Sequence, residues 1–124
     1  MKTKLTLIVL EVCDRAQRNG VVPLNILVNN EKKPLSKYIS TKSLDDTLSE
    51  VLSKYSNNLS LKYCQAYLSD FFHEQGSNEC EVVYTVKMPQ NMISPSRYSQ
   101  IVDMNKANIE KKYARTIQSI PRSI

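Results

Sequence analysis

The clearest hydrophobic pattern in the chain is a nearly continuous apolar run near its N-terminal end. Residues 4–13 carry apolar side chains on both faces of an extended strand, which is typical of a central strand covered on both sides. A polar stretch ending in Asn19-Gly20, a strong turn signal, separates this run from a second one over residues 22–29. Pro23 fits the start of a strand or a sheet edge. The two runs predict a β-hairpin with a long polar loop.

One segment has the period of an α-helix. Its apolar side chains recur so that they share one helical face, and they are Leu44, Leu48, Val51, Leu52 and Tyr55. Ser43 is a suitable N-cap, and Asp45 and Asp46 follow in the first turn, where negative charge favours a helix. Asn57-Asn58 can end the helix, because asparagine tolerates the left-handed conformation. Residues 30–42, before the helix, are predicted to be a loop.

Two more extended segments follow the helix. Residues 59–72 are rich in apolar and aromatic types, and the polar residues 73–78 predict a turn. Residues 79–88 alternate between an apolar face and a wetter face, which predicts a strand that ends before Pro89.

The last part of the chain predicts one irregular segment and one helix. Residues 90–104 contain a proline and no clear period, whereas residues 105–119 have apolar positions at helical spacing and are followed by Pro121. The predicted element order is therefore ββ-α-ββ-α. We expect one α/β domain over residues 1–120 and a short C-terminal tail over residues 121–124, with helices covering the faces of a sheet.

Positive charge is concentrated near the C-terminus. The chain has a net charge of +5. Between residues 97 and 124, basic residues outnumber the acidic Asp103 and Glu110; they are Arg97, Lys106, Lys111, Lys112, Arg115 and Arg122. A basic segment of this kind can contact RNA or an acidic protein surface. A solvated helix face explains the same charges more simply.

Cysteine usage and hydropathy indicate where the protein works. No stretch approaches the ~20 apolar residues that a membrane-spanning helix needs, so we expect no membrane partner. Cys13, Cys64 and Cys80 are odd in number and widely spaced, which does not suit a disulfide framework. All three lie in apolar segments, as buried thiols do. We expect an intracellular, reducing compartment, most simply the cytoplasm.

No catalytic pattern is present in the sequence. His73, the single histidine, falls in a predicted surface turn, and nothing nearby indicates an activated Cys64 or Cys80 thiolate. The two glycines, Gly20 and Gly76, are too far apart for a phosphate-binding loop. Asp45 and Asp46 are explained by the helix start rather than by a metal ion. We therefore expect no catalytic residues, no metal site and no cofactor.

Two groups of residues are candidates for binding. The first is a basic loop that also contains an aromatic residue, a weak nucleic-acid or phosphate signal; its lysines are Lys32, Lys33, Lys37 and Lys42. The second consists of aromatic and basic residues suited to a protein interface, and its members are Tyr38, Tyr98, Arg97, Lys111, Lys112 and Arg115.

The order of elements resembles the Nudix hydrolase fold over roughly residues 3–118. The run from Ser43 to Leu52 looks like the helix of the Nudix box, and residues 66–72 with residues 81–86 look like the strands that follow the box. The nearest branch is that of ADP-ribose-type pyrophosphatases and Nudix-like transcriptional regulators. The resemblance implies an α/β/α sandwich with a mixed sheet.

The same resemblance implies that the catalytic helix has lost its chemistry. In the register set by Ser43-Leu44, the box glycines fall on Ser36 and Asn57, and the first box glutamate falls on Lys42. The Arg-Glu pair falls on Glu50-Val51 and the Glu-Glu pair on Lys54-Tyr55. These enzymes hold Mg²⁺ with those carboxylates. A degenerate box of this kind predicts neither metal binding nor turnover.

The sequence thus favours a non-catalytic Nudix-like binding or scaffold domain, which meets a protein partner or a second copy of itself within a larger assembly. A nucleotide or ADP-ribose-like binder without hydrolysis is one alternative, with Lys32, Lys33 and Lys37 near phosphate groups. An RNA-binding accessory subunit that uses the basic C-terminal segment is another. An active pyrophosphohydrolase would need other acids, such as Asp45, Asp46 and Glu50.

Overall fold

The computed structural model of the chain describes residues 1–13 and 24–121. The turn predicted at Asn19-Gly20, the first part of the second predicted strand and residues 122–124 of the predicted tail lie outside the described residues. The elements are β1 (Lys2–Val12), β2 (Leu24–Asn29), β3 (Leu35–Ile39), α1 (Leu44–Tyr55), β4 (Tyr67–His73), β5 (Glu79–Pro89), β6 (Ser99–Asp103), the 3₁₀ turns η1 (Met104–Lys106) and η2 (Lys111–Tyr113), and α2 (Ala114–Gln118).

The described strands form one mixed sheet. Its order is β4-β5-β1-β2-β6, and β3 pairs with β1 outside this path. β1 runs parallel to β5 along its whole length and antiparallel to β2 and β3. Because β3 pairs with residues 3–7 of β1 and β2 pairs with residues 9–12, these two strands follow one another along one side of β1. The antiparallel pairing of β1 and β2 is the one that the hairpin prediction required.

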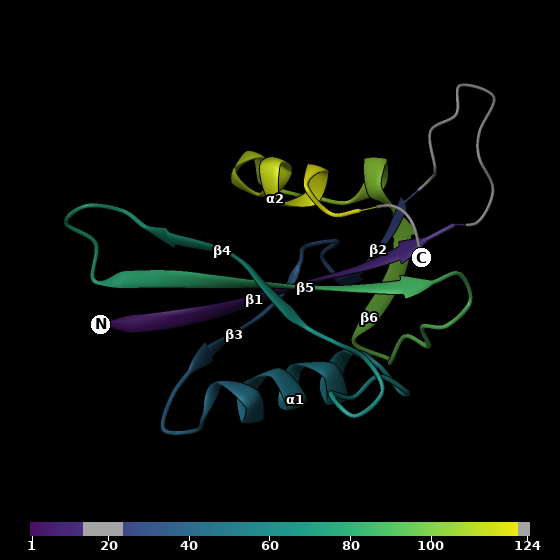
Figure 1. The fold of residues 1–124 in the computed structure, drawn as a ribbon, viewed down its shortest axis with the longest axis horizontal. Coiled ribbons are helices and arrows are strands. Elements are labelled where there is room, and N and C mark those ends of the chain that lie inside the picture. The colour runs from purple at the N-terminus through teal and green to yellow at the C-terminus, as the bar shows by residue number, and fades with distance from the viewer. Residues whose placement is uncertain (14–23, 122–124) are drawn as a thin grey trace.

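The sheet lies between two helical layers, with α1 on one face and the C-terminal segment of η1, η2 and α2 on the other (Figure 1). Alternate side chains of β1 divide between the two layers. Leu5, Leu7 and Val9 pack in a first core, between the sheet and α1. Ile8, Leu10 and Val12 pack in a second core, between the sheet and the C-terminal segment. The predicted central strand is confirmed, as is an α/β/α sandwich with a mixed sheet.

α1 begins as the sequence predicts. The Ser43 hydroxyl accepts a hydrogen bond from the backbone N–H of Asp46 at 3.2 Å, which satisfies one of the unpaired donors of the first turn. Leu48, Val51 and Leu52 are buried against the sheet. The apolar stripe is therefore the face that holds the helix to β1 and β3.

The predicted end of α1 is wrong. The helix ends at Tyr55, and neither Asn57 nor Asn58 has a positive φ angle. Instead, the hydroxyl groups of Ser96 and Ser99 donate to carbonyl oxygens of the last helical turn. These partners come from a loop more than 40 residues later in the chain, so local pattern could not identify them.

Two strands are missing from the predicted order. β3 lies within residues 30–42, predicted to be a loop, and β6 lies within residues 90–104, predicted to be irregular. Both segments are short and contain many polar residues. They become strands because β1 and β2 supply the backbone partners, which tertiary context provides and propensity does not.

Other predicted elements are shorter than expected. Within residues 59–72 only β4 is a strand. Before it the chain makes a turn that begins at Ser60, whose carbonyl accepts the backbone hydrogen bonds of the turn. The helix predicted over residues 105–119 is broken into η1, η2 and α2, and between η1 and η2 the backbone N–H of Asn108 donates to the Lys32 carbonyl at 2.7 Å instead of to a helical partner. The predicted turn before β5 is confirmed, with Gly76 at φ +83°, but it begins after His73, which ends β4.

The predicted wetter face of β5 is buried. Glu81, Val83 and Thr85 lie beneath the C-terminal segment rather than in water. Cys13 and Cys80 are also buried, Cys64 is half-buried, and none of the three forms a disulfide. Across the residues that the structure describes, no helix is long and apolar enough to cross a membrane.

The contrast between the core and the sheet edge gives a stability prediction. We expect Leu52→Ala to lower the free energy of unfolding by about 2–5 kcal/mol, because the side chain is fully buried between α1 and the sheet. Leu68→Ala, on the exposed part of β4, is the matched control and should change it by less than about 0.5 kcal/mol. Urea unfolding measures both; equal effects would contradict the assigned core.

Candidate functional site

β4 presents apolar side chains at the edge of the sheet. Leu68 is 62% exposed and Phe71 is 58% exposed. Residues three apart lie on opposite faces of a regular strand, but a β-bulge between Leu68 and Asp70 shifts the register. As a result Leu68 pairs with Tyr84 and Phe71 with Val82, both on the face that α1 covers elsewhere. Leu68, Phe71, Val82 and Tyr84 are called the β4 patch below.

The backbone edge of β4 is partly occupied by its own side chains. The Ser69 hydroxyl donates to the Tyr67 carbonyl at 3.0 Å, and the Asp70 carboxylate accepts from the backbone N–H of Phe71 at 2.8 Å. The other oxygen of Asp70 accepts from Thr116 of α2. Such bonds and a bulge protect an edge strand against pairing with another strand. The β4 patch therefore offers side chains, rather than free backbone groups, to a partner.

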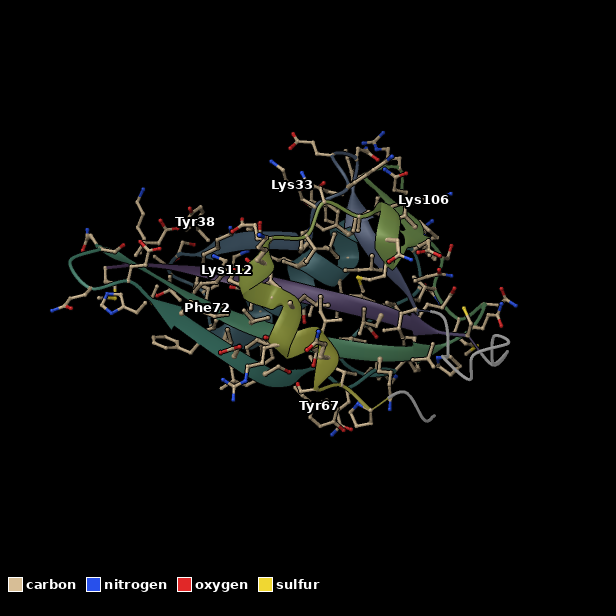
Figure 2. The ribbon with its side chains drawn as sticks, turned by 90° about the horizontal axis from the view of Figure 1, so that it is seen from above. Lys33, Tyr38, Tyr67, Phe72, Lys106 and Lys112 are labelled. Atoms are coloured by element: carbon tan, nitrogen blue, oxygen red, sulfur yellow. The ribbon has the colours of Figure 1, made fainter. Side chains whose placement is uncertain are left out.

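A cleft of about 530 Å³ opens on the opposite face of the sheet, beside the C-terminal segment. A row of four residues, each paired in register with the next on the adjacent strand, lines the cleft. In the strand order β3-β1-β5-β4 they are Tyr38, Lys4, Glu81 and Phe72. Lys112 of η2 lies between Tyr38 and Phe72 in the view from above (Figure 2). A second cleft of about 400 Å³ shares Lys4 and is bordered by Lys33.

Glu81 ties the C-terminal segment to the floor of the cleft. Its carboxylate is buried and accepts hydrogen bonds from the hydroxyls of Thr6 and Tyr113. Lys112 reaches the other carboxylate oxygen at 2.7 Å. The Tyr113 ring in turn packs edge-on against Phe72, with ring centroids 6.0 Å apart. One charged group thus joins β1, β5 and η2.

The pKa values around Glu81 follow from these contacts. Burial by itself raises the pKa of the Glu81 carboxyl, but the hydrogen bonds from Lys112, Thr6 and Tyr113 outweigh it and leave the pKa below its ordinary value. Burial lowers the pKa of Lys112, and its bond to Glu81 more than reverses this. Burial and the same carboxylate raise the pKa of Tyr113. At neutral pH the Glu81–Lys112 pair is therefore fully ionised.

The cleft is not strongly positive. Its lining includes the carboxylates Glu74, Glu79 and Glu81 as well as the cations Lys4 and Lys112. Lys112 is also engaged by Glu81. A phosphate group entering the cleft would meet similar numbers of both charges, so the cleft by itself is not an anion trap.

The four lysines predicted to contact phosphate do not share one site. Lys33 borders the second cleft and pairs with Glu31 at 3.4 Å. Lys37 and Lys42 both bind Glu50 of α1, on the other face of the sheet. The hydrogen bond from Lys37, which has the larger effect, and the hydrogen bond from Lys42 lower the pKa of the Glu50 carboxyl to about 2. Lys32 occupies the turn between β2 and β3, with φ at +63°.

The residues predicted to meet a partner also separate into groups. Tyr38 and Lys112 line the first cleft. Arg97 and Tyr98 lie in the loop before β6, where the guanidinium group stacks on the tyrosine ring. Lys111 and Arg115 are exposed on the C-terminal segment.

Sequence reasoning missed the residues that build the two surfaces. Leu68 and Phe71 looked like ordinary strand residues because a bulge cannot be read from this pattern. Glu81 looked solvated because nothing in its alternating segment indicates a cover. His73 and Cys80 stand opposite one another in β4 and β5; His73 contacts the Ser77 carbonyl and Cys80 contacts Thr3, so they are not engaged as a pair.

Comparison with known proteins identifies the architecture. No protein-family model matches the chain, and no curated protein sequence matches it. Among solved structures, the C-terminal domain of mouse MUTYH, in complex with human PCNA, is similar with a TM-score of 0.59 and 12% identity, over 95% of this chain and 86% of that one. The NUDIX domain of Shewanella oneidensis NrtR, complexed with ADP ribose, is similar with a TM-score of 0.57 and 12% identity, over 92% of this chain and 83% of that one.

A MutT/nudix family protein from Listeria innocua is similar with a TM-score of 0.53 and 13% identity. The match covers 70% of this chain but 64% of the Listeria protein, so the chain spans less than two thirds of that protein's length. The chain has a Nudix-like fold. The predicted resemblance is confirmed at the level of architecture.

Lys42, in the loop before α1, and Glu50 of the helix form an ion pair. The pair fastens the loop before α1 to the helix.

The carboxylates of α1 do not gather into a site for the Mg²⁺ ion associated with Nudix hydrolases. Asp45 and Asp46 lie in the first turn of the helix, and the glutamate positions of the register predicted from the sequence carry Lys42, Val51, Lys54 and Tyr55. Hard cations require oxygen ligands, usually carboxylates, and Glu50 is already held by two lysines. Within residues 1–13 and 24–121, no three His, Cys, Asp or Glu side chains come together as a metal site.

The Glu81 network gives a pH prediction. We expect Glu81→Gln to lower the free energy of unfolding at pH 7 by roughly 1–3 kcal/mol, because three donors lose a charged acceptor. Since the pKa of Glu81 is lower in the folded than in the unfolded state, its contribution is present above the unfolded pKa and is lost as the pH falls through the folded value. The difference in the free energy of unfolding between the wild-type protein and Glu81→Gln should therefore become smaller in acid.

Urea unfolding between pH 7 and pH 3 measures this gap. Glu110→Gln is the matched control, because Glu110 lies 3.8 Å from the same Lys112 but is exposed. The control should follow the wild-type protein closely. A gap that stays constant with pH would show that Glu81 does not titrate as described.

Proposed function

We propose that this domain is a non-catalytic Nudix-like binding domain that recruits a protein partner as a subunit of a larger assembly. One observation carries the proposal. The bulge in β4 brings Leu68 and Phe71 to one face, where both are more than half exposed. Exposed apolar clusters on an otherwise polar surface mark sites of protein interaction.

The partly occupied edge of β4 supports a particular mode of binding. Ser69 and Asp70 engage neighbouring backbone groups, so an added strand would have to displace these bonds. Side-chain docking needs no such rearrangement. The partner is therefore expected to cover the β4 patch with apolar groups, and aromatic anchors such as Phe71 dominate interfaces of this kind.

The absence of catalysis is supported by the donor chemistry of α1. Lysine, valine and tyrosine side chains at the glutamate positions of the predicted register do not hold Mg²⁺. The Lys42–Glu50 ion pair holds the loop before α1 to the helix, which is a structural role. Among similar structures, the mouse MUTYH domain was solved in complex with the protein PCNA, which supports a binding role for a fold of this shape.

A second candidate is a nucleotide-like ligand in the first cleft. Tyr38 and Phe72 form two aromatic walls near Lys4 and Lys112, and the similar NrtR domain was solved with ADP ribose. Aromatic rings and lysines suit a base and a phosphate. The three carboxylates of the same cleft oppose a phosphate, so this candidate ranks below a protein partner. An RNA-binding role has less support still, because Lys112 is committed to Glu81.

Removal of the β4 patch should release the partner. We expect a stoichiometric partner to co-purify with the wild-type protein under native conditions and to be lost from the double variant Leu68→Ser/Phe71→Ser, because the variant no longer buries apolar surface. Mass spectrometry identifies the partner, and sedimentation velocity detects a second copy of this chain.

Met92→Ser is the matched control, because Met92 is 51% exposed but lies in the loop between β5 and β6. It should retain the partner. Melting temperatures establish that both variants fold. Equal recovery of the partner by all three proteins, or a wild-type monomer with no partner, would refute the proposal.

The absence of catalysis and the second candidate are tested together with ADP-ribose and Mg²⁺. We expect no release of AMP above the rate in buffer, because α1 lacks the carboxylates of the Nudix box. A rise in melting temperature without turnover would favour the second candidate, since a ligand of the folded state stabilises it. Magnesium-dependent release that Asp46→Ala abolishes would overturn the non-catalytic assignment.

A further inference from the structure

The second cleft, of about 400 Å³, lies on the face of the sheet opposite α1. Its floor is formed by β1 and β3, which contribute the directly paired Thr6 and Ser36. The turn between β2 and β3 forms one wall, and the C-terminal segment forms another. The backbone hydrogen bond from Asn108 to the Lys32 carbonyl joins these two walls. The volume is within the range of small-molecule sites, roughly 300–1,000 Å³.

Lys4 of β1 is half-buried and borders both clefts. Its direct neighbour in the sheet is Glu81, but both oxygens of that carboxylate are already engaged. One oxygen binds Lys112, and the other accepts hydrogen bonds from Thr6 and Tyr113. Within the part of the chain that the structure describes, Lys4 forms no ion pair. A cation that a central strand holds at the floor of a cleft without a counter-charge attracts an anion.

Two neutral side chains of the second cleft are also unengaged. Among the described residues, the Ser36 hydroxyl and the Asn108 side-chain amide have no hydrogen-bond partner. A hydroxyl and an amide can each donate a hydrogen bond to a phosphate or carboxylate oxygen. The cleft therefore offers donors of two kinds, an ammonium group and neutral polar groups, to one ligand.

The charge of the second cleft differs from that of the first. Lys33 on the wall adds a positive charge to that of Lys4. Of the described residues that line this cleft, only Glu110 carries a carboxylate, and it lies 3.8 Å from Lys112. The first cleft has three carboxylates against two lysines. Positive charge thus prevails in the second cleft alone, which favours an anionic ligand there.

We propose that the second cleft binds a small polar anion, whose phosphate or carboxylate group pairs with Lys4 and accepts hydrogen bonds from Ser36 and Asn108. Charge-assisted hydrogen bonds of this kind are stronger than neutral ones. The β4 patch lies on the α1 face, so this site is independent of the protein-binding proposal. It also differs from the nucleotide candidate, whose ligand would lie between the aromatic walls of the first cleft.

Calorimetric titration at low ionic strength tests the site with three related probes: glucose 6-phosphate, gluconate and uncharged glucose. We expect saturable binding of at least one anionic probe and no binding of glucose. The dissociation constant should rise about tenfold or more in Lys4→Gln, because a charge-assisted hydrogen bond is lost. Ser36→Ala and Asn108→Ala should each raise it about two- to tenfold, because each removes one neutral donor.

Lys2→Gln is the matched control. Lys2 lies two residues before Lys4 on the same strand and carries the same charge, but it lies over the Tyr38 ring and does not line the second cleft. This variant should bind the probes as the wild-type protein does, and so should Tyr38→Ala, which removes one wall of the first cleft. Melting temperatures establish which variants fold. If Lys4→Gln does not fold, Ser36→Ala and Asn108→Ala decide the outcome.

Binding of glucose 6-phosphate alone would identify a phosphate-bearing ligand, and binding of gluconate alone would identify a carboxylate. Binding of both would establish a site for either group. The proposal fails if neither anionic probe binds, if glucose binds as tightly, or if Lys2→Gln weakens binding as much as Lys4→Gln does. Weaker binding in Tyr38→Ala, with no change in Ser36→Ala and Asn108→Ala, would place the ligand in the first cleft and would also refute it.

Discussion

The parallel pairing of β1 with β5 is the interaction on which the rest of the structure depends. It runs the full length of both strands, and β1 is apolar on both of its faces. Parallel pairs of this kind are stable only when both faces are covered. α1 supplies one cover, and the C-terminal segment supplies the other. β2 and β3 then share the remaining side of β1, and the Nudix-like sandwich results.

Neither cover extends over the whole sheet, and the uncovered parts are where binding chemistry is found. On the α1 face, β4 lies beyond the helix, and its bulge places Leu68 and Phe71 side by side. On the other face, the C-terminal segment leaves a cleft whose floor is the ionised Glu81. The network around Glu81 both closes the second core and shapes the cleft. Stability and site geometry therefore depend on the same residues in this half of the molecule.

The charges of α1 help to hold the fold together. Glu50 of the helix binds Lys37 of β3 and Lys42 of the preceding loop. At the end of the helix, Lys54 lies against the rings of Tyr55 and Tyr98, and Arg97 lies against the Tyr98 ring as well. These contacts join α1 to β3 and to the loop before β6.

The sequence by itself determined the elements whose signals are local. The two-faced β1, the Ser43 cap with its apolar stripe and the turn before β5 all follow from hydrophobic period, capping and turn chemistry within short windows. Only the tertiary structure decided the rest. β3 and β6 became strands because neighbours offered backbone partners, α1 ended where Ser96 and Ser99 reached its carbonyl groups, and Glu81 was buried because a distant segment covers it. Each of these depends on groups far apart in the chain, whose contacts no local pattern encodes.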